Sequence, residues 1–446
     1  MKNLILKLII NYLKILTCSY IKREKVEVIG LTGSVGETTL TLAIHKILSL
    51  KYRVGMTFKQ GHGLNSETGI PLAILGVHVD GFTIVEWLNY LIKATFNFFF
   101  KRCEYEKIVV EMGVDKPNDM EFLLSMIKPK VGVFLSISKV HTEKFQSLYE
   151  KTYKKKSLLD LVFEEKAKLI RSLPENGYAV LNNDNRSIIN FKKEIKCKTI
   201  SFGLESGSNI LGKIISVSSE RFVGTITYES QEDRIIISDY LINKGIFTTF
   251  LASTAVGAVY GIDIKSSVKS LEDLKLPPGR MSKLTGVRDI VIIDSSYNAS
   301  KLAVIEALDN LALYKNRKKI AVLGDMRELG SEEKGEHEKI ARKAVKIAHE
   351  IITVGPAMKC YFVPEALKHG FNKGKIHTFD NTWNAMIFLR DKLIKGGEAI
   401  LVKGSQNTLY MEIIVEGILK DKSKKEEVLC RRGDFWNKKR EALKPR

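Results

Sequence analysis

The sequence predicts two α/β domains: a doubly wound parallel-sheet domain with a phosphate-binding loop (P-loop), followed by a second, smaller Rossmann-like α/β domain. Short apolar, β-branched runs alternate with helix-like periodicity from residue 25 to about 200, and again after residue 290; this alternation is typical of βαβ units. A glycine-rich turn at 30–41 follows one such run. Because Pro277-Pro278-Gly279 interrupts the chain, we expect an N-terminal helix (1–24), a first domain (25–276) and a second domain (277–446).

Composition limits the classes of partner. The 446 residues include 71 Lys+Arg and 51 Asp+Glu, a net charge of +20, which favours anionic partners such as nucleotides or acidic lipid. No arginine-rich tract with interleaved aromatic residues occurs, so we expect no nucleic-acid binding. The 5 cysteines form no C-x-x-C pair, which predicts neither a zinc site nor a disulfide framework and fits a reducing cytoplasm.

The first twenty residues are apolar but interrupted by Lys2, Lys7, Asn11 and Lys14. The apolar run between these charges is shorter than a bilayer requires, and there is no small-residue cleavage site of a secretory signal. An amphipathic helix on the cytoplasmic face of a membrane, with its lysines near anionic lipid, fits this pattern. A helix packed on the domain behind it fits equally well.

The glycine-rich stretch has the context of a phosphate-binding loop. A β-branched run (26–29) precedes it and a helix-like apolar pattern (40–48) follows it. Glycines allow backbone N–H groups to point at phosphate oxygens, and a helix N-terminus favours negative charge. We therefore expect a nucleotide contact from Thr32, Gly33, Ser34, Val35, Gly36, Glu37, Thr38 and Thr39. Such loops carry a lysine where this chain has Glu37.

Three further polar residues follow strands or open a helix in the first domain. Glu111 ends the run V-V-E, His141 follows the run at 131–136, and Lys166 lies near the start of a helix-like segment. Strand ends in α/β sheets are where ligands bind. The hydroxyl of Thr38, the carboxylate of Glu111 and the imidazole of His141 are reasonable partners for Mg²⁺ beside phosphates.

The rest of the chain also predicts strands, helices and polar turns. Residues 200–240 predict short antiparallel strands, and a helix follows near 248–260. In the second domain we expect strands at 290–294, 320–323, 351–354 and 399–402, each ending in a polar or glycine turn. Arg280 follows the proline turn, and Asp294 and Asn298 lie in D-S-S-Y-N. Turns after apolar strands are where ligand loops belong.

Taken together and in this order, the motifs resemble the Mur ligase family, and within it the MurF-type ligases. The matching stretches are T-G-S-V-G-E-T-T (32–39), N-S-E-T-G-I-P-L (65–72), V-V-E-M-G-V-D (109–115), V-H-T-E-K-F (140–145), P-G-R-M (278–281), I-D-S-S-Y-N-A-S (293–300), V-L-G-D-M-R-E-L-G (322–330) and L-V-K-G-S-Q (401–406). The resemblance covers roughly residues 25–440.

The resemblance implies an activity in cytoplasmic peptidoglycan synthesis. ATP would phosphorylate the carboxylate of a UDP-MurNAc-peptide, and the amine of D-alanyl-D-alanine would attack the acyl phosphate to form an amide. By motif, Thr38, Glu111 and His141 would hold Mg²⁺ in the central ATPase domain. Lys166 matches the family's carbamylated lysine. Asp294 and Asn298 would contact the nucleotide, and Arg280 would face its phosphates.

Several positions depart from the family pattern. Glu37 replaces the loop lysine, residues 244–251 lack the usual His and Asn, Ser295 replaces an Asp, and Tyr410 replaces an Arg. From the resemblance we also expect no counterpart of the family's N-terminal sugar-nucleotide domain in residues 1–24. These departures leave an alternative: a catalytically impaired homologue that acts as a binding or scaffold protein in envelope synthesis. A polyglutamylating enzyme is a third possibility, against which the Y-N-A, G-D-M-R-E-L-G and K-G-S turns argue.

Overall fold

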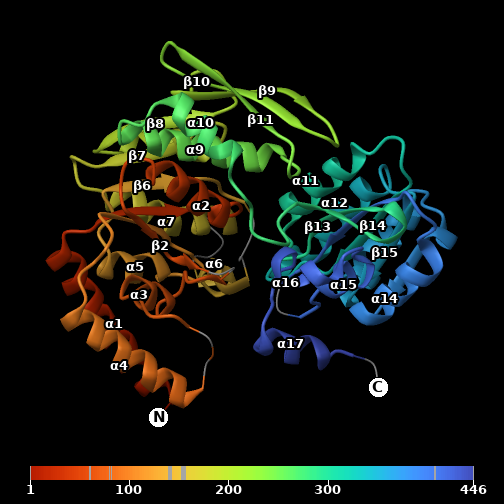
Figure 1. Cartoon of the computed structure of the whole chain (residues 1–446), viewed down its shortest axis with the longest axis horizontal. Coiled ribbons are helices and arrows are strands. Elements are labelled where there is room, and N and C mark those ends of the chain that lie inside the picture. Colours follow the sequence, from red (N-terminus) through yellow and green to blue (C-terminus); the bar gives the residue numbers. More distant parts are fainter. Residues whose placement is uncertain are drawn as a thin grey trace. The chain divides into compact units, whose positions relative to one another are not determined.

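The computed structural model describes residues 2–59, 62–79, 81, 83–138, 143–151, 157–405 and 408–444. It divides into two compact units, which we describe separately (Figure 1). The first unit comprises residues 1–214, 224–235 and 246–274; the second comprises 215–223, 236–245 and 275–446. The expected fold class, a doubly wound P-loop-type domain followed by a Rossmann-like α/β domain, is confirmed. The expected boundary between residues 276 and 277 stays a prediction.

The sheet associated with the first unit has nine strands in the order β11-β10-β9-β8-β7-β6-β1-β5-β2. Strand β1 pairs in parallel with both β5 and β6, so it lies in the middle of the parallel part. The strands are β1 (Glu27–Thr32), β2 (Val54–Met56), β5 (Lys107–Glu111), β6 (Val131–Phe134), β7 (Tyr178–Asn182), β8 (Lys198–Gly203), β9 (Ile210–Val217), β10 (Phe222–Tyr228) and β11 (Gln231–Ile237), with a separate pair β3 (Phe58–Lys59) and β4 (His62–Gly63).

The helices of this part are α1 (Lys2–Glu24), α2 (Glu37–Leu48), α3 (Gly69–Ile74), α4 (Ile84–Phe100), α5 (Asp119–Met126), α6 (Gln146–Lys151), α7 (Leu158–Arg171), α8 (Arg186–Phe191), α9 (Lys244–Val259) and α10 (Ile264–Glu272). Helix α2 contacts β1 and β5, and α7 contacts β1 and β6. The apolar periodicity at 40–48 is thereby explained, because Leu40, Ile44 and Ile47 are fully buried. These contacts hold the start of α2 beside the carboxyl ends of β1 and β5.

Helix α1 packs on the domain that follows it. Its residues Leu13, Leu16 and Tyr20 are buried in the same core as the strands, and it contacts α3, α4 and α5. The packed-helix alternative therefore describes one face of α1. The helix is also continuous over 23 residues, so that Leu4–Glu24 is long and apolar enough to cross a membrane by length and composition, a test that core helices also pass.

The second unit is built on a six-stranded sheet in the order β12-β13-β17-β14-β15-β16. Only β12 runs antiparallel to its neighbour among these pairs. The strands are β12 (Ser282–Thr285), β13 (Val291–Ser295), β14 (Lys319–Gly324), β15 (Glu350–Val354), β16 (Ile376–Phe379) and β17 (Ala399–Lys403). The helices are α11 (Lys301–Ala312), α12 (Glu333–Ala344), α13 (Val363–Lys368), α14 (Thr382–Phe388), α15 (Glu412–Ile418), α16 (Lys425–Val428) and α17 (Asp434–Glu441).

Candidate active site

The glycine-rich loop joins β1 to α2, and its geometry requires glycine at one position. Gly36 caps the start of α2 with φ 97° and ψ 0°, a left-handed conformation that disfavours side chains. A Cβ added there would lie 2.9 Å from Thr249 Cγ2, closer than non-bonded carbons approach. Helix α2 begins at the next residue, Glu37. The loop therefore leads straight into a helix N-terminus, where backbone N–H groups are available to an anion.

The turn after β6 holds the loop in place. The backbone N–H groups of Ser34 and Val35 donate to Ser136 Oγ at 3.2 and 3.4 Å, and the N–H of Ser138 donates to Ser34 Oγ at 2.9 Å. Sequence reasoning did not select Ser136 or Ser138 as site residues. The polar S-I-S turn directly after an apolar strand was the signal that could have found them.

A hydrogen-bonded group, buried except for Asn65, lies at the ends of β1 and β5. Thr38 Oγ1 donates to Glu111 Oε2 at 3.2 Å, and Asn65 Nδ2 donates to Glu111 Oε1 at 3.0 Å. The N–H of Glu111 donates to Thr57 Oγ1 at 3.2 Å. The structure thus brings together Thr38 and Glu111 as the sequence predicted; it adds Asn65, which donates to the carboxylate, and Thr57, which holds the backbone of Glu111.

Lys166 reaches the glycine-rich loop from α7. Its ammonium Nζ donates to the carbonyl oxygen of Gly33 at 2.5 Å, and the side chain is 2% exposed. Burial lowers the pKa of Lys166, while the nearby carboxylates of Glu37, Asp115 and Glu111 oppose that shift. A lowered pKa favours the neutral amine, which is the nucleophilic form of lysine.

The remaining predicted residues of the loop differ in accessibility. Thr32 is buried and donates from Oγ1 to the carbonyl oxygen of Met112 at 3.1 Å, and Thr39 is buried at the start of α2. His141 lies outside the described residues. Within the described part of the chain, no group of three or more His, Cys, Asp and Glu side chains is placed to hold a metal ion.

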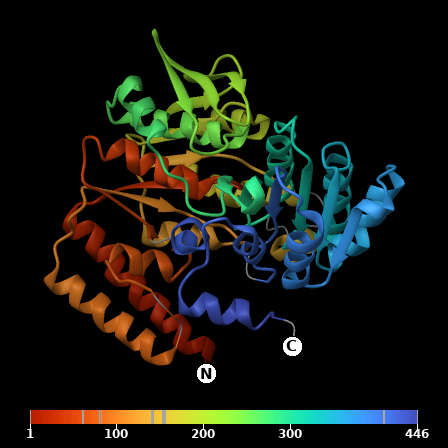
Figure 2. The ribbon, with the colours of Figure 1, turned by 45° about the vertical axis from the view of Figure 1, so that its right-hand side comes forward.

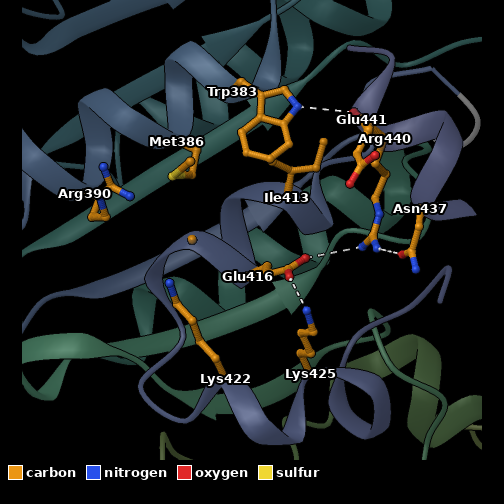
Figure 3. A pocket seen from close by; sticks show the side chains of 11 residues that line it. Trp383, Met386, Arg390, Ile413, Glu416, Lys422, Lys425, Asn437, Arg440 and Glu441 are labelled. Carbon is orange, nitrogen blue, oxygen red and sulfur yellow. Dashed lines mark hydrogen bonds and ion pairs between the residues drawn. The ribbon is translucent and has the colours of Figure 1, made fainter. Parts of the chain in front are cut away.

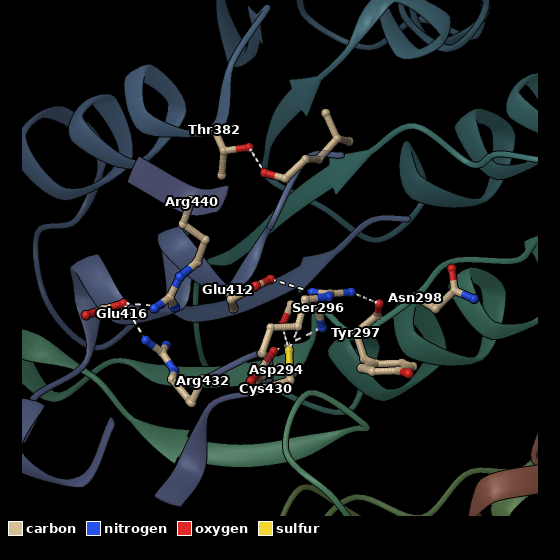
Figure 4. Close-up of polar contacts among 12 residues, drawn as sticks. Asp294, Ser296, Tyr297, Asn298, Thr382, Glu412, Glu416, Cys430, Arg432 and Arg440 are labelled. Atoms are coloured by element: carbon tan, nitrogen blue, oxygen red, sulfur yellow. Dashed lines mark hydrogen bonds and ion pairs between the residues drawn. The ribbon is translucent and has the colours of Figure 1, made fainter. Parts of the chain in front are cut away.

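In the second unit, Asp294 is the penultimate residue of β13 and is fully buried (Figure 4). Its Oδ1 accepts the N–H of Ser296 at 3.0 Å, and its Oδ2 has no hydrogen-bond partner among the described residues. Burial raises the pKa of Asp294. Arg431 lies close by, bound to Glu412 at 2.6 Å and to the carbonyl oxygen of Tyr297. Asp294 is therefore enclosed in the unit's interior.

Arg280 and Asn298 lie near the same turn. The Arg280 guanidinium stacks 4.2 Å from the ring centre of Tyr297, and Asn298 is exposed, with its carbonyl oxygen accepting from Lys403 Nζ at 2.8 Å. Lys403 also donates to Ser295 Oγ at 3.0 Å. Burial lowers the pKa of Lys403 to about 7. Ser295, where the family carries an Asp, therefore accepts from a buried lysine.

A separate cavity of about 360 Å³ lies in the second unit beside α14, α15 and α17 (Figure 3). Trp383, Glu416 and Arg440 are among its lining residues. Two of its basic side chains pair with one acid: Arg440 Nη1 and Lys425 Nζ lie 3.5 and 3.4 Å from the Glu416 carboxylate. None of the residues predicted as site residues lines this cavity.

The fold and the first of these sites define a class: α/β proteins in which a phosphate loop, a helix N-terminus and a strand-end carboxylate meet at the edge of a parallel sheet. The model of the Mur ligase middle domain matches residues 31–256, and that of the Mur ligase glutamate ligase domain matches residues 279–406. The chain belongs to the Mur ligase family.

Similar proteins and structures agree with that assignment. The UDP-N-acetylmuramoyl-tripeptide–D-alanyl-D-alanine ligase of Bacillus subtilis is 25% identical over 400 residues, which cover 89% of this chain and 77% of that protein. The Escherichia coli enzyme of the same name is 25% identical over 398 residues, covering 87% and 76%. The structure of MurF from Thermotoga maritima in complex with ADP has a TM-score of 0.72 at 24% identity, covering 93% of this chain and 84% of that one. MurF from Acinetobacter baumannii has a TM-score of 0.74 at 20% identity, covering 92% and 80%.

Proposed function

We propose that this protein is an ATP-dependent amide ligase of the MurF type, which adds D-alanyl-D-alanine to a UDP-MurNAc-tripeptide in peptidoglycan synthesis. The observation that carries the proposal is the extent of the similarity: ligases of that name match 89% of this chain, across both Mur ligase domains. The reaction we propose passes through an acyl phosphate. ATP transfers its terminal phosphoryl group to the substrate carboxylate, and the amine of the dipeptide displaces phosphate.

The first unit supplies the groups for the phosphates of ATP. The start of α2 would offer backbone N–H groups to the phosphates, and the N–H groups of Ser34 and Val35 would join them by leaving Ser136 Oγ. Thr38 Oγ1 and the Glu111 carboxylate offer adjacent oxygen ligands, which is the donor chemistry that Mg²⁺ prefers. When bound there, Mg²⁺ would neutralise phosphate charge. Asn65 would keep the Glu111 carboxylate oriented toward that position, and Thr57 would fix the backbone of Glu111.

The other sequence-predicted residues keep the roles that the resemblance implies. Lys166 would become carbamylated, which its lowered pKa supports because the neutral amine is the reactive form. His141 would complete the Mg²⁺ ligands. Arg280, Asp294 and Asn298 would meet the nucleotide from the second domain (277–446). For Asp294 this requires that its enclosed Oδ2 become accessible.

We further propose a cytoplasmic location, with residues 1–20 in peripheral contact with the inner face of the membrane. The Mur ligase family membership supports the first part, because UDP-linked substrates and ATP are cytoplasmic metabolites. The apolar residues of α1 that face solvent, Leu4, Ile5 and Leu8 among them, support the second.

The test is direct detection of the amide product. The protein is incubated with ATP, Mg²⁺, a UDP-MurNAc-tripeptide and D-alanyl-D-alanine, and the UDP-MurNAc-pentapeptide is measured by mass spectrometry. We expect product that requires ATP and is absent with L-alanyl-L-alanine. Glu111→Gln should lower its rate at least about a hundredfold, while Glu175→Gln, at an exposed site, should not. A folded natural protein that binds ATP but forms no product would refute the proposal.

A further inference from the structure

Helix α4 carries an apolar face that nothing in the described structure covers. Its residues Ile84, Val85, Leu88, Ile92, Phe96, Phe99 and Phe100 have exposed fractions from 55% to 89%. The spacing 88, 92, 96, 100 places them on one side of the helix. The opposite side carries Tyr90, Ala94 and Asn97, which are buried. Helix α4 is thus apolar on two faces, of which the domain's own core explains only one.

Helix α1 has the same two-sided character and lies beside α4. Its inner face carries the buried residues Leu13 and Leu16, whereas Leu4, Leu8 and Ile15 are 64%, 62% and 64% exposed. The two helices run side by side in both views of the molecule (Figures 1 and 2). Each helix therefore has an outer apolar face, and we call the two outer faces together the α1–α4 face.

Specific contacts fix the two helices to each other and to the core. Tyr12 and Thr95 share a hydrogen bond of 2.6 Å between their hydroxyl oxygens. The Arg23 guanidinium lies 5.2 Å from the ring centre of Tyr20 and 4.9 Å from that of Phe98. The buried residues of α1 would leave the core if α1 crossed a bilayer. The α1–α4 face is therefore a rigid surface that can lie on a membrane without unfolding.

The charged residues of these two helices indicate which kind of surface the α1–α4 face would bind. Helix α1 contains five Lys and Arg residues and one acidic residue, Glu24, which pairs with Arg23. In α4 the acidic residue is Glu86, whose carboxylate accepts the N–H of Thr83 at the helix start. Exposed basic side chains occur on both helices and directly after α4: Lys7, Lys22, Lys93, Lys101 and Arg102, with one exposed acidic side chain, Glu104, beside the last two. Helices that expose apolar residues together with an excess of lysines and arginines match a bilayer that contains anionic phospholipid.

We propose that the α1–α4 face docks the protein on the surface of a bilayer with anionic headgroups, and that α4 supplies the larger part of the inserted apolar surface. This inference extends the peripheral contact proposed above from residues 1–20 to two helices. The aromatic cluster at the end of α4 strengthens it: the rings of Phe96 and Phe100 are 4.8 Å apart and those of Phe98 and Phe99 are 4.9 Å apart. Lys101 and Arg102 directly follow this cluster, as in segments that rest at the headgroup level.

The experiment is vesicle flotation of the full chain with phosphatidylcholine vesicles, alone or containing phosphatidylglycerol. The test variant combines Leu88→Ser, Ile92→Ser and Phe96→Ser. Its matched control combines Leu50→Ser, Ile189→Ser and Ile215→Ser, three exposed apolar residues elsewhere. We expect the natural chain and the control to float with phosphatidylglycerol vesicles, and the test variant to bind at least about tenfold more weakly.

Charge is tested separately with Lys93→Glu and Lys101→Glu together, against Lys213→Glu and Lys265→Glu as exposed controls. Only the first pair should weaken binding to phosphatidylglycerol vesicles. Thermal melting establishes that each variant is folded. Equal vesicle binding by the natural chain and the α4 variant would overturn the proposal. So would a natural chain that ignores vesicles but forms a dimer that the α4 substitutions dissociate. Ligation of soluble substrates should be unchanged in the α4 variant, so a failed ligase assay leaves this test intact.

Discussion

At the scale of single residues, Glu37 stands where phosphate loops of this type carry a lysine. It opens α2 next to the glycine-rich loop, where a phosphate group would sit. A carboxylate about 4 Å from a phosphate charge costs roughly 4 kcal/mol at an effective dielectric constant of about 20. Glu37 is partly exposed, so solvent reduces this cost. We expect the remaining repulsion between the Glu37 carboxylate and phosphate to weaken nucleotide affinity.

Replacing Glu37 should therefore strengthen nucleotide binding. Glu37→Lys is expected to raise the affinity for ATP at least about tenfold, or about 1.4 kcal/mol, and Glu37→Gln to give an intermediate value. Isothermal titration with ATP and Mg²⁺ measures both. Glu175→Lys, an equal charge change at an exposed site, controls for the effect of net charge. If all three variants bind ATP as the natural chain does, Glu37 does not face the phosphates.

A second residue-scale feature is the shifted pKa values of two ionisable groups, the half-buried Glu306 on α11 and the buried Lys403 on β17. Burial raises the pKa of Glu306 to about 7 and lowers that of Lys403 to about 7. As pH rises, Glu306 loses its proton near pH 4.5 in the unfolded chain but only near pH 7 in the folded protein. The contribution of Glu306 to the free energy of unfolding is therefore fully present below about pH 4.5 and is lost as pH rises through about 7. The contribution of Lys403 to stability changes only at higher pH, above about 7.

Glu306→Gln should remove this pH dependence. Between about pH 5 and about pH 8, the free energy of unfolding of the natural protein should fall by at least about 1 kcal/mol more than that of the variant. Urea unfolding at the two pH values measures the difference. Glu205→Gln, at an exposed site, should behave as the natural chain does. Parallel pH profiles for the natural chain and Glu306→Gln would show that Glu306 is ionised throughout.

At the scale of elements, the strand–loop–helix unit was predictable because each part follows from local chemistry. The β-branched run gives β1, the glycines give the loop, and the apolar spacing from Leu40 to Leu48 gives α2. The exposed apolar faces of α1 and α4 were harder to predict from the sequence. Apolar periodicity identifies a buried face, but it does not reveal that a helix also exposes apolar residues. Residues 246–251, where the resemblance leads us to expect His and Asn, are buried in α9, which the sequence alone did not indicate.

At the same scale, the conformation of Gly36 at the start of α2 predicts that a side chain there destabilises the loop. Gly36→Ala places a Cβ at a positive φ and 2.9 Å from Thr249 Cγ2. We expect a loss of about 1–2 kcal/mol of stability and a loss of ATP affinity, measured by urea unfolding and by titration. Gly335→Ala in α12 is the control, because a Cβ there meets nothing within 4 Å. Equal stability of the two variants would mean that the loop relaxes freely.

At the scale of the whole molecule, the order of motifs predicted both α/β domains and the family. The pairing of Thr38 with Glu111 was also predictable, since adjacent parallel strands end at one edge of the sheet. The enclosure of Asp294 was not, because it depends on Arg431, Cys430 and Glu412, which lie far along the chain and pack around it only in the folded unit. The roles of Arg280, Asp294 and Asn298 toward the nucleotide remain predictions.

The most direct test of ligation through an acyl phosphate is isotope transfer from the substrate. The UDP-MurNAc-tripeptide is labelled with ¹⁸O in its terminal carboxylate and incubated with the natural protein, ATP, Mg²⁺ and D-alanyl-D-alanine. Mass spectrometry then measures the label in the released phosphate. Attack of the amine on an acyl phosphate predicts one ¹⁸O in each phosphate formed, in step with amide product. Phosphate that carries no label, or the absence of any phosphate release that depends on D-alanyl-D-alanine, would contradict it.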